Sequence, residues 1–182
     1  MDLVKGIKER RSIRKFQDKP IDRKLIEEIV ETARFAPSWK NTQIVRYLVV
    51  DDKEKIAAIA NSKCTYGFDY NIKAIAGAPA VVILTFVEGR SGFDKDGSFS
   101  TPKGEGWQMF DAGIAAQTFC LAAHEKGLGT VIQGYFDDVE LKKVLPIPEG
   151  QQVGAVIPIG YPTEVEVAAP PRKEASELLT FI

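Results

Sequence analysis

The chain has 182 residues, enough for one domain with a sizeable core. Apolar residues make up 45% and charged residues 27%, and the net charge of −1 lacks the basic surplus of a nucleic-acid binder. Two cysteines and one histidine are too few for a disulfide scaffold or for a zinc site of the usual kind. The few cysteines and the lack of an apolar signal segment lead us to expect a cytoplasmic protein.

The first half of the chain predicts an irregular series of helices and strands. Asp22 can cap a helix whose apolar side chains recur at helical spacing, and residues 79–87 are apolar on both faces, which indicates a central strand. The expected helices cover residues 2–10, 22–33 and 51–60, and the expected strands cover residues 44–50 and 79–87, with residues 69–76 left ambiguous.

Residues 88–106 show neither a helix nor a strand pattern. They hold five glycines, one proline and scattered charges. A loop of this length inside a compact domain is usually either functional or disordered. A mobile lid, with Phe93, Phe99 and Trp107 as candidate contacts, and plain disorder therefore both stay open.

The second half of the chain contains the most apolar helix and an unusual tail. Residues 109–126 predict a helix that is apolar nearly all round, which places it in the core or in a subunit interface. Four of the last five residues are large and apolar, so residues 163–182 are expected to dock, and a partner subunit is a reasonable place. The remaining elements are strands over residues 129–134 and 152–159 and a helix over residues 137–145. Together the elements predict a mixed sheet with helices on both faces.

A basic cluster lies close to the N-terminus. Residues 1–15 carry six basic and two acidic side chains, and Arg10, Arg11 and Arg14 surround the hydroxyl of Ser12. Guanidinium groups and a hydroxyl suit a phosphate, because each guanidinium can donate two charge-assisted hydrogen bonds. A solvated basic face on a short helix is the alternative interpretation.

The chain carries no obvious acid–base machinery of its own. Neither the glycine-rich dinucleotide fingerprint nor the P-loop pattern is present. The single histidine, His124, lies on the apolar helix, which disfavours a Ser-His-Asp triad. Cys120 is expected to be inert core, and Cys64 lies in a polar loop where it could be accessible. This lack of reactive groups indicates that the chemistry comes from a cofactor.

Several stretches in a fixed order together resemble the FMN-dependent nitroreductase family. They cover residues 10–14, 36–43, 71, 78–82, 111–117, 127–130, 159–162 and 171–173. The resemblance runs from about residue 5 to about residue 175, and each stretch alone is a weak motif. It implies an α+β fold with a mixed, mainly antiparallel sheet flanked by helices, in one domain of residues 1–182. It also implies a homodimer with FMN at the subunit interface and with the C-terminal tail extending onto the partner.

The resemblance assigns the basic cluster to the flavin. Arg10, Arg11 and Ser12 would hold the phosphate and the ribityl chain, helped by Arg172 and Lys173 from the tail. Arg14 would reach the N1–O2 edge of the flavin, where a fixed positive charge stabilises the anion of the reduced ring. Some family members place a second Lys or Arg three residues after the asparagine; here that position is Ala74, so the anion would depend more on Arg14.

The other implied contacts come from loops. Asn71 would hydrogen-bond the pyrimidine edge, and Gln133 and Gly134 would lie near N5 and O4, mostly through backbone groups. The partner subunit would contribute Pro37, Ser38, Trp39 and Asn41. Trp39 stands where the family commonly has Ser or Ala, so its ring could stack over the flavin or narrow the pocket.

The implied activity is a ping-pong oxidoreduction. NADH or NADPH would reduce FMN, and a nitroaromatic, quinone or activated alkene would then accept the reducing equivalents. Two alternatives stay open: a protein that stores or senses flavin, or performs oxygen-dependent flavin chemistry, without dedicated reductase turnover, and a non-flavin anion-binding dimer. The Glu-x-x-x-Tyr-x-x-x-Lys lid of a halogen-removing branch is absent between Glu88 and Gln108, which disfavours that branch.

Overall fold

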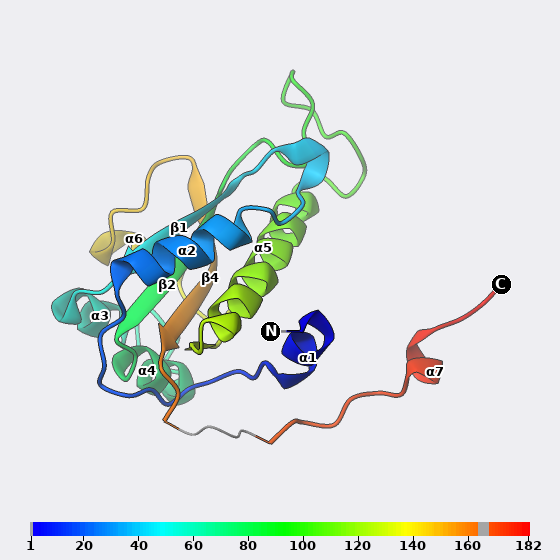
Figure 1. The fold of residues 1–182 in the computed structure, drawn as a ribbon. Coiled ribbons are helices and arrows are strands. Elements are labelled where there is room, and N and C mark those ends of the chain that lie inside the picture. The colour runs from blue at the N-terminus through cyan, green and yellow to red at the C-terminus, as the bar shows by residue number, and fades with distance from the viewer. Residues whose placement is uncertain (1, 164–167) are drawn as a thin grey trace.

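The computed structural model describes residues 2–163 and 168–182 (Figure 1). Its centre is a four-stranded sheet of β1 (Val45–Val50), β2 (Ala80–Val87), β3 (Gly129–Thr130) and β4 (Gln151–Gly160). The strand order is β1-β2-β4-β3, and each neighbouring pair is antiparallel. A parallel bridge between Ser12 and Thr130 adds to the β3 edge. The expected α+β class with a mainly antiparallel sheet is confirmed.

The helices surround this sheet. They are α1 (Leu3–Glu9), α2 (Arg23–Ala33), α3 (Lys53–Ile59), α4 (Asp69–Ala76), α5 (Gly106–Glu125), α6 (Asp138–Val144) and α7 (Ala175–Leu178), with a 3-10 turn η1 (Trp39–Asn41). Asp22 and Asp137 cap α2 and α6, and both carboxylates accept backbone N–H groups of the first helical turn. None of the helices in the described ranges is long and apolar enough to cross a bilayer.

Three expected boundaries differ from the structure. The ambiguous residues 69–76 form α4, and α5 begins at Gly106 rather than at Met109. The start of α5 has no side-chain cap, so the sequence gives no local signal for it. The strand expected over residues 129–134 ends at Thr130. Beyond it, the chain contacts β4 through the Val131 N–H, which lies 3.4 Å from the Pro158 carbonyl oxygen, and through an isolated bridge between Gln133 and Val156.

The sheet separates two apolar clusters. Val82, Leu84 and Phe86 of β2 pack with α2 and α5, whereas Val81 and Ile83 pack with α3, α4 and α6. Successive side chains of a strand point to opposite faces, so β2, which is apolar except for the buried Thr85, supplies both clusters. The prediction of a central strand here is confirmed, and helices cover both faces of the sheet (Figure 1).

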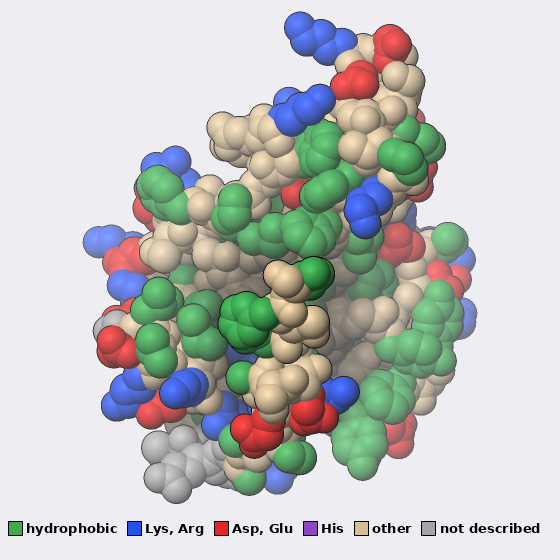
Figure 2. Space-filling model, turned by 90° about the vertical axis from the view of Figure 1, so that its right-hand side faces the viewer, with side chains coloured by type: hydrophobic (Ala, Val, Ile, Leu, Met, Phe, Trp, Pro, Cys, Tyr) green, Lys and Arg blue, Asp and Glu red, His purple; other side chains and the backbone are tan. Residues whose placement is uncertain are grey.

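One side of α5 and one side of α1 remain exposed. Met109 and Phe110 of α5 are 52% and 59% exposed, although Phe119 on the opposite side is fully buried. Leu3, Val4 and Ile7 of α1 are exposed as well. Figure 2 looks toward the side of the molecule that carries α5, α1 and the tail, and it shows hydrophobic side chains spread across it. The apolar side chains of α5 thus pack into the core on one side of the helix and are exposed on the other.

The C-terminal tail lies outside the core. Residues 168–182 are exposed along their whole length and run away from the sheet to α7 (Figure 1). Leu178, Leu179, Phe181 and Ile182 are among the most exposed apolar side chains. The expectation that residues 163–182 embrace a partner falls partly on residues 164–167, which lie outside the described residues.

Candidate functional site

The basic cluster lies beside β3. Arg10 ends α1, and the Ile13 N–H donates to the Thr130 carbonyl at 2.9 Å. This bond, with the parallel bridge between Ser12 and Thr130, extends the β3 edge of the sheet. The position of the cluster is therefore set by backbone pairing rather than by its charges.

Two arginines of this cluster have a buried donor without a partner. The Nε atoms of Arg10 and Arg11 are both buried and make no hydrogen bond in the described structure. Arg11 also donates through Nη1 to the carbonyls of Lys8 and Arg10 at 2.6 and 2.9 Å, so part of its guanidinium stabilises the end of α1. A buried N–H without an acceptor is unfavourable, and these donors suit an anionic ligand.

Arg14 and Ser12 are more open. The side chains of both are exposed, and Arg14 Nη1 donates to the Ser12 carbonyl at 3.3 Å. The Ser12 hydroxyl is therefore free of the core and can accept or donate toward a ligand on the same edge as Arg10.

Asn71 contacts the chain two residues beyond Gln133. Asn71 is buried on α4 and donates through Nδ2 to the Tyr135 carbonyl at 3.2 Å. The N–H and the carbonyl of Gln133 are both bonded to Val156, at 2.9 and 3.0 Å. The Gln133 backbone is therefore engaged in the sheet. Its side-chain Nε2 is buried and unpartnered instead, which leaves this amide and Gly134 for a ligand.

The loop of residues 37–43 is strained and well anchored. Lys40, Asn41 and Gln43 have φ angles of 44°, 56° and 50°, in the left-handed region that residues other than glycine rarely adopt. Ser38 Oγ accepts the Gln43 N–H at 3.0 Å. The Trp39 N–H donates to both carboxylate oxygens of Asp111, at 3.0 and 3.1 Å. Such strain persists only where the surroundings fix the backbone.

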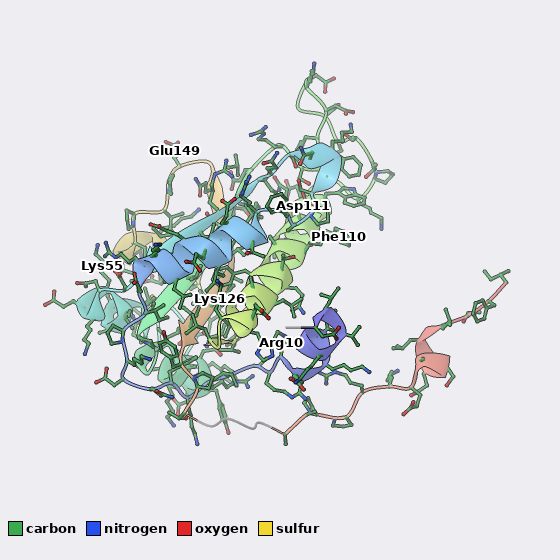
Figure 3. All side chains as sticks on the ribbon, viewed as in Figure 1. Arg10, Lys55, Phe110, Asp111, Lys126 and Glu149 are labelled. Atoms are coloured by element: carbon green, nitrogen blue, oxygen red, sulfur yellow. The ribbon has the colours of Figure 1, made fainter. Side chains whose placement is uncertain are left out.

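The basic cluster and this aromatic loop lie at opposite ends of α5. Figure 3 shows Arg10 near the C-terminal end of the helix, and Phe110 and Asp111 near its N-terminal end. At 1.5 Å per residue, the rise from Asp111 to His124 is roughly 20 Å. His124 belongs to the basic end: burial lowers its pKa, and the charge of Arg10 acts in the same direction, against that of Glu9.

The tail arginine does not join either group within one chain. Among the described residues, Arg172 Nη1 donates to the carbonyls of Pro170 and Pro171, both at 3.3 Å, and Lys173 is exposed. The structure thus brings Arg10, Arg11, Ser12, Arg14, Asn71, Gln133 and Gly134 to one side of the molecule, with Pro37, Ser38, Trp39 and Asn41 elsewhere and Arg172 and Lys173 apart from both.

A cavity borders the aromatic loop. It has a volume of about 570 Å³ and lies between α2 and the start of β1, with Pro37, Ser38 and Asp111 in its wall. Most of its other lining side chains are apolar. The cavity does not reach the basic cluster, so it is not the phosphate-binding part of the site.

Both cysteines are buried, which disfavours a role as nucleophiles. Cys120 is buried as expected, but Cys64 is also buried, so the expectation that it could be accessible is wrong. The segment around Cys64 folds back through Asn61, whose side chain accepts the Cys64 N–H at 3.1 Å. Burial raises the pKa of both thiols, which makes them poor nucleophiles.

Sequence reasoning missed Asp111, Ser91 and Gln108. Each is buried and holds a loop: Ser91 Oγ donates to Asp111 Oδ2 at 2.7 Å, and the Gly89 N–H donates to Gln108 Oε1 at 2.7 Å. A signal existed for Asp111, because it is a carboxylate within the most apolar helix of the chain, more than three turns before the other carboxylate of that helix, Glu125.

The fold and these groups define an α+β protein with an anion-binding arrangement at one sheet edge and an aromatic loop at the far end of α5. A family model described as "Nitroreductase family" matches residues 7–65 and 68–161. The chain therefore belongs to the nitroreductase family.

Individual relatives agree with this assignment. A Methanothermobacter thermautotrophicus protein with the provisional name NADH dehydrogenase/NAD(P)H nitroreductase is 33% identical over 168 residues, covering 90% of this chain and 79% of the relative. An FMN reductase [NAD(P)H] from Bacillus subtilis is 27% identical and covers 100% of this chain and 75% of its own. A provisionally named nitroreductase from Desulfovibrio desulfuricans, solved in complex with FMN, aligns with a TM-score of 0.76 at 25% identity, covering 100% of this chain and 97% of that chain.

Proposed function

We propose that the protein is an FMN-dependent oxidoreductase that takes reducing equivalents from NADH or NADPH. The observation that carries the proposal is the set of buried, unpartnered donors on one side of the molecule, namely Arg10 Nε, Arg11 Nε and Gln133 Nε2. These donors match a ligand with a phosphate at one end and a polar ring edge at the other. The names of the relatives, which include an FMN reductase and an FMN complex, support the same ligand.

The chain's own residues bind and orient the flavin. Arg10, Arg11 and Ser12 hold the phosphate through charge-assisted bonds, and Asn71 and the Gln133 amide hold the pyrimidine edge. Arg14 places its charge near N1–O2, where it favours the reduced, anionic ring. FMN, when bound, supplies the hydride and electron chemistry, which the side chains do not provide.

The site is shared between two subunits of a homodimer. Arg10 lies near the C-terminal end of α5, and Trp39 is bonded to Asp111 near the other end. This separation favours a site in which Pro37, Ser38, Trp39 and Asn41 come from the partner. The exposed sides of α5 and α1 offer the apolar surface that such a dimer buries. The tail crosses to the partner and brings Arg172 and Lys173 to the phosphate. The dimer acts in the cytoplasm on small electrophilic acceptors such as nitroaromatics, quinones or activated alkenes.

Anaerobic mixing tests the activity. The purified protein should be yellow, should release FMN on denaturation, and should bleach when NADH or NADPH is added without oxygen. Addition of a quinone or nitroaromatic should then restore the colour. A yellow protein that neither nucleotide bleaches contradicts the reductase and favours flavin storage or sensing. A colourless protein that takes up no FMN contradicts the flavin site itself.

A further inference from the structure

We propose that Asp111 is a positioning residue that holds Trp39 and the segment 88–106 together as one preformed wall of the acceptor pocket. The positioning of Trp39 and the segment 88–106 by Asp111 is a property of the folded chain and does not depend on the proposed function. The use of the wall by a flat aromatic acceptor rests on the proposed function. The two parts are tested by different measurements.

Asp111 is a buried carboxylate with two separate duties. It is 2% exposed, on a helix whose other buried residues are mostly small or apolar. It accepts the Trp39 N–H on both oxygens and the Ser91 hydroxyl on Oδ2. Burial of a carboxylate is unfavourable unless hydrogen bonds compensate for it. An alanine would satisfy the packing of α5, so the carboxylate is explained by the two loops that it joins.

Gln108 adds a second tie one turn earlier on the same helix. It accepts the Gly89 N–H at 2.7 Å, and residues three apart on a helix lie on the same face. Gly89 and Ser91 both belong to the start of the segment 88–106. The first turns of α5 therefore fix the beginning of this segment and, through Asp111, the Trp39 loop. The segment is an ordered part of the site, and the alternative of plain disorder is not needed.

Two further contacts tie the Trp39 loop to this region, one through the first turn of α5 and one directly to the segment 88–106. The Trp39 and Trp107 rings lie 4.4 Å apart between centroids, at 44°, and Trp107 Nε1 donates to Thr101 Oγ1 at 3.0 Å. Lys40 Nζ lies 3.2 Å from Asp94 Oδ1. The ion pair thus connects the two loops directly, whereas the aromatic pair and the Asp111 bonds connect them through the first turns of α5. Together these contacts explain how the strained backbone of Lys40 is maintained.

The wall faces the exposed side of α5. Trp107 also contacts Phe110, with ring centroids 5.4 Å apart and planes at 73°. Figure 3 shows Phe110 pointing away from α2, on the side that the proposed dimer covers. In that dimer, Trp39, Trp107 and Phe110 face the partner's flavin. Stacked and edge-on rings favour flat aromatic partners, so the wall selects planar acceptors over small non-aromatic ones.

A spectroscopic test of the positioning needs no substrate. Trp39 and Trp107 are the two tryptophans of the chain, so a far-ultraviolet exciton couplet in circular dichroism reports this pair alone. The couplet should be present in the native protein and absent in Trp107→Phe. It should disappear in Asp111→Ala and weaken in the isosteric Asp111→Asn, which keeps one acceptor oxygen. Ser91→Ala, which leaves the Trp39 bond intact, is the matched control and should retain it.

Kinetics test the use of the wall. In Asp111→Asn, the KM of a planar quinone should rise about tenfold, with kcat and the FMN dissociation constant changed by less than about twofold. A couplet that survives in both Asp111 variants overturns the positioning role. A couplet that is lost while KM is unchanged overturns the wall. A protein without NAD(P)H-driven turnover refutes the proposed function, and the couplet still decides whether Asp111 positions Trp39.

Discussion

Gly129→Ala tests whether β3 positions the basic cluster. A Cβ at Gly129 would lie 2.6 Å from Ile13 Cγ1, 2.7 Å from Ile13 Cβ and 2.9 Å from Ile13 Cγ2. Ordinary carbon contacts are about 3.5–4.0 Å, so Ile13 and the chain around it must move by roughly 1 Å. Ile13 is buried, and overpacking of this kind costs about 1–3 kcal/mol of folding free energy.

The same displacement should weaken FMN binding. Ser12 and Arg11 directly precede Ile13, and the Ile13 N–H bond to Thr130 fixes their position. Loss of one charge-assisted bond to the phosphate corresponds to about 1.5–3 kcal/mol, which is a rise in the dissociation constant of roughly tenfold or more.

Two assays and one control make this prediction decisive. Urea unfolding of the apoprotein gives the stability, and quenching of flavin fluorescence gives the FMN affinity. Gly106→Ala is the control, because nothing lies within 4 Å of its added Cβ and it stands at the start of α5. It should preserve FMN binding and raise stability by up to about 1 kcal/mol. If Gly129→Ala loses stability but binds FMN as the wild type does, β3 does not position the cluster.

Three further predictions concern single side chains. Arg10→Ala and Arg172→Ala should each weaken FMN binding by about 1.5–3 kcal/mol, measured by fluorescence titration; unchanged affinity in both would break the phosphate assignment. Arg14→Ala should lower the flavin midpoint potential with a smaller effect on affinity, and a redox titration without a shift would remove Arg14 from the N1–O2 edge. Burial raises the pKa of Tyr47 from 10.0 to about 12. The neutral phenol therefore makes its full contribution to the free energy of unfolding below pH 10, and this contribution is lost as the pH rises toward 12. Tyr47→Phe should lack this alkaline loss in urea unfolding, and an identical pH profile in both proteins would refute the assignment.

Local signals in the sequence predicted much of the fold. Asp22 and Asp137 cap their helices because a carboxylate accepts the free N–H groups of the first turn, which depends only on neighbouring residues. The apolar character of both faces of β2 predicted its central place for a similar reason. The start of α5, which has no such cap, is one of the boundaries that sequence reasoning placed wrongly.

The candidate site depends on contacts that sequence patterns do not contain. The bond between Trp39 and Asp111 joins residues 72 positions apart. Lys40 and Gln43 have a left-handed backbone, but neither is a glycine, so the sequence carries no signal for this conformation. The engagement of the Gln133 backbone by Val156 likewise follows from sheet register, which no local pattern around Gln133 shows.

The division of the site into two groups is a further property of the folded chain. Arg10 and Trp39 appear in the sequence within 30 positions of each other, yet the structure sends them to opposite ends of α5. The family resemblance implied that Trp39 belongs to the partner's flavin. The length of α5 supplies a physical reason for that proposal, because the fixed rise of the helix keeps its two ends roughly 20 Å apart.

A comparison of FMN with riboflavin tests the central claim most directly. Riboflavin lacks the phosphate, so it keeps the ring contacts and loses those of Arg10, Arg11 and Ser12. Titration of the apoprotein should show FMN binding at least about tenfold more tightly than riboflavin, as expected for one or more charge-assisted bonds, and Arg10→Ala should reduce that preference. Equal affinity for the two flavins, or a preference that Arg10→Ala leaves intact, would contradict the assignment of the basic cluster to the FMN phosphate.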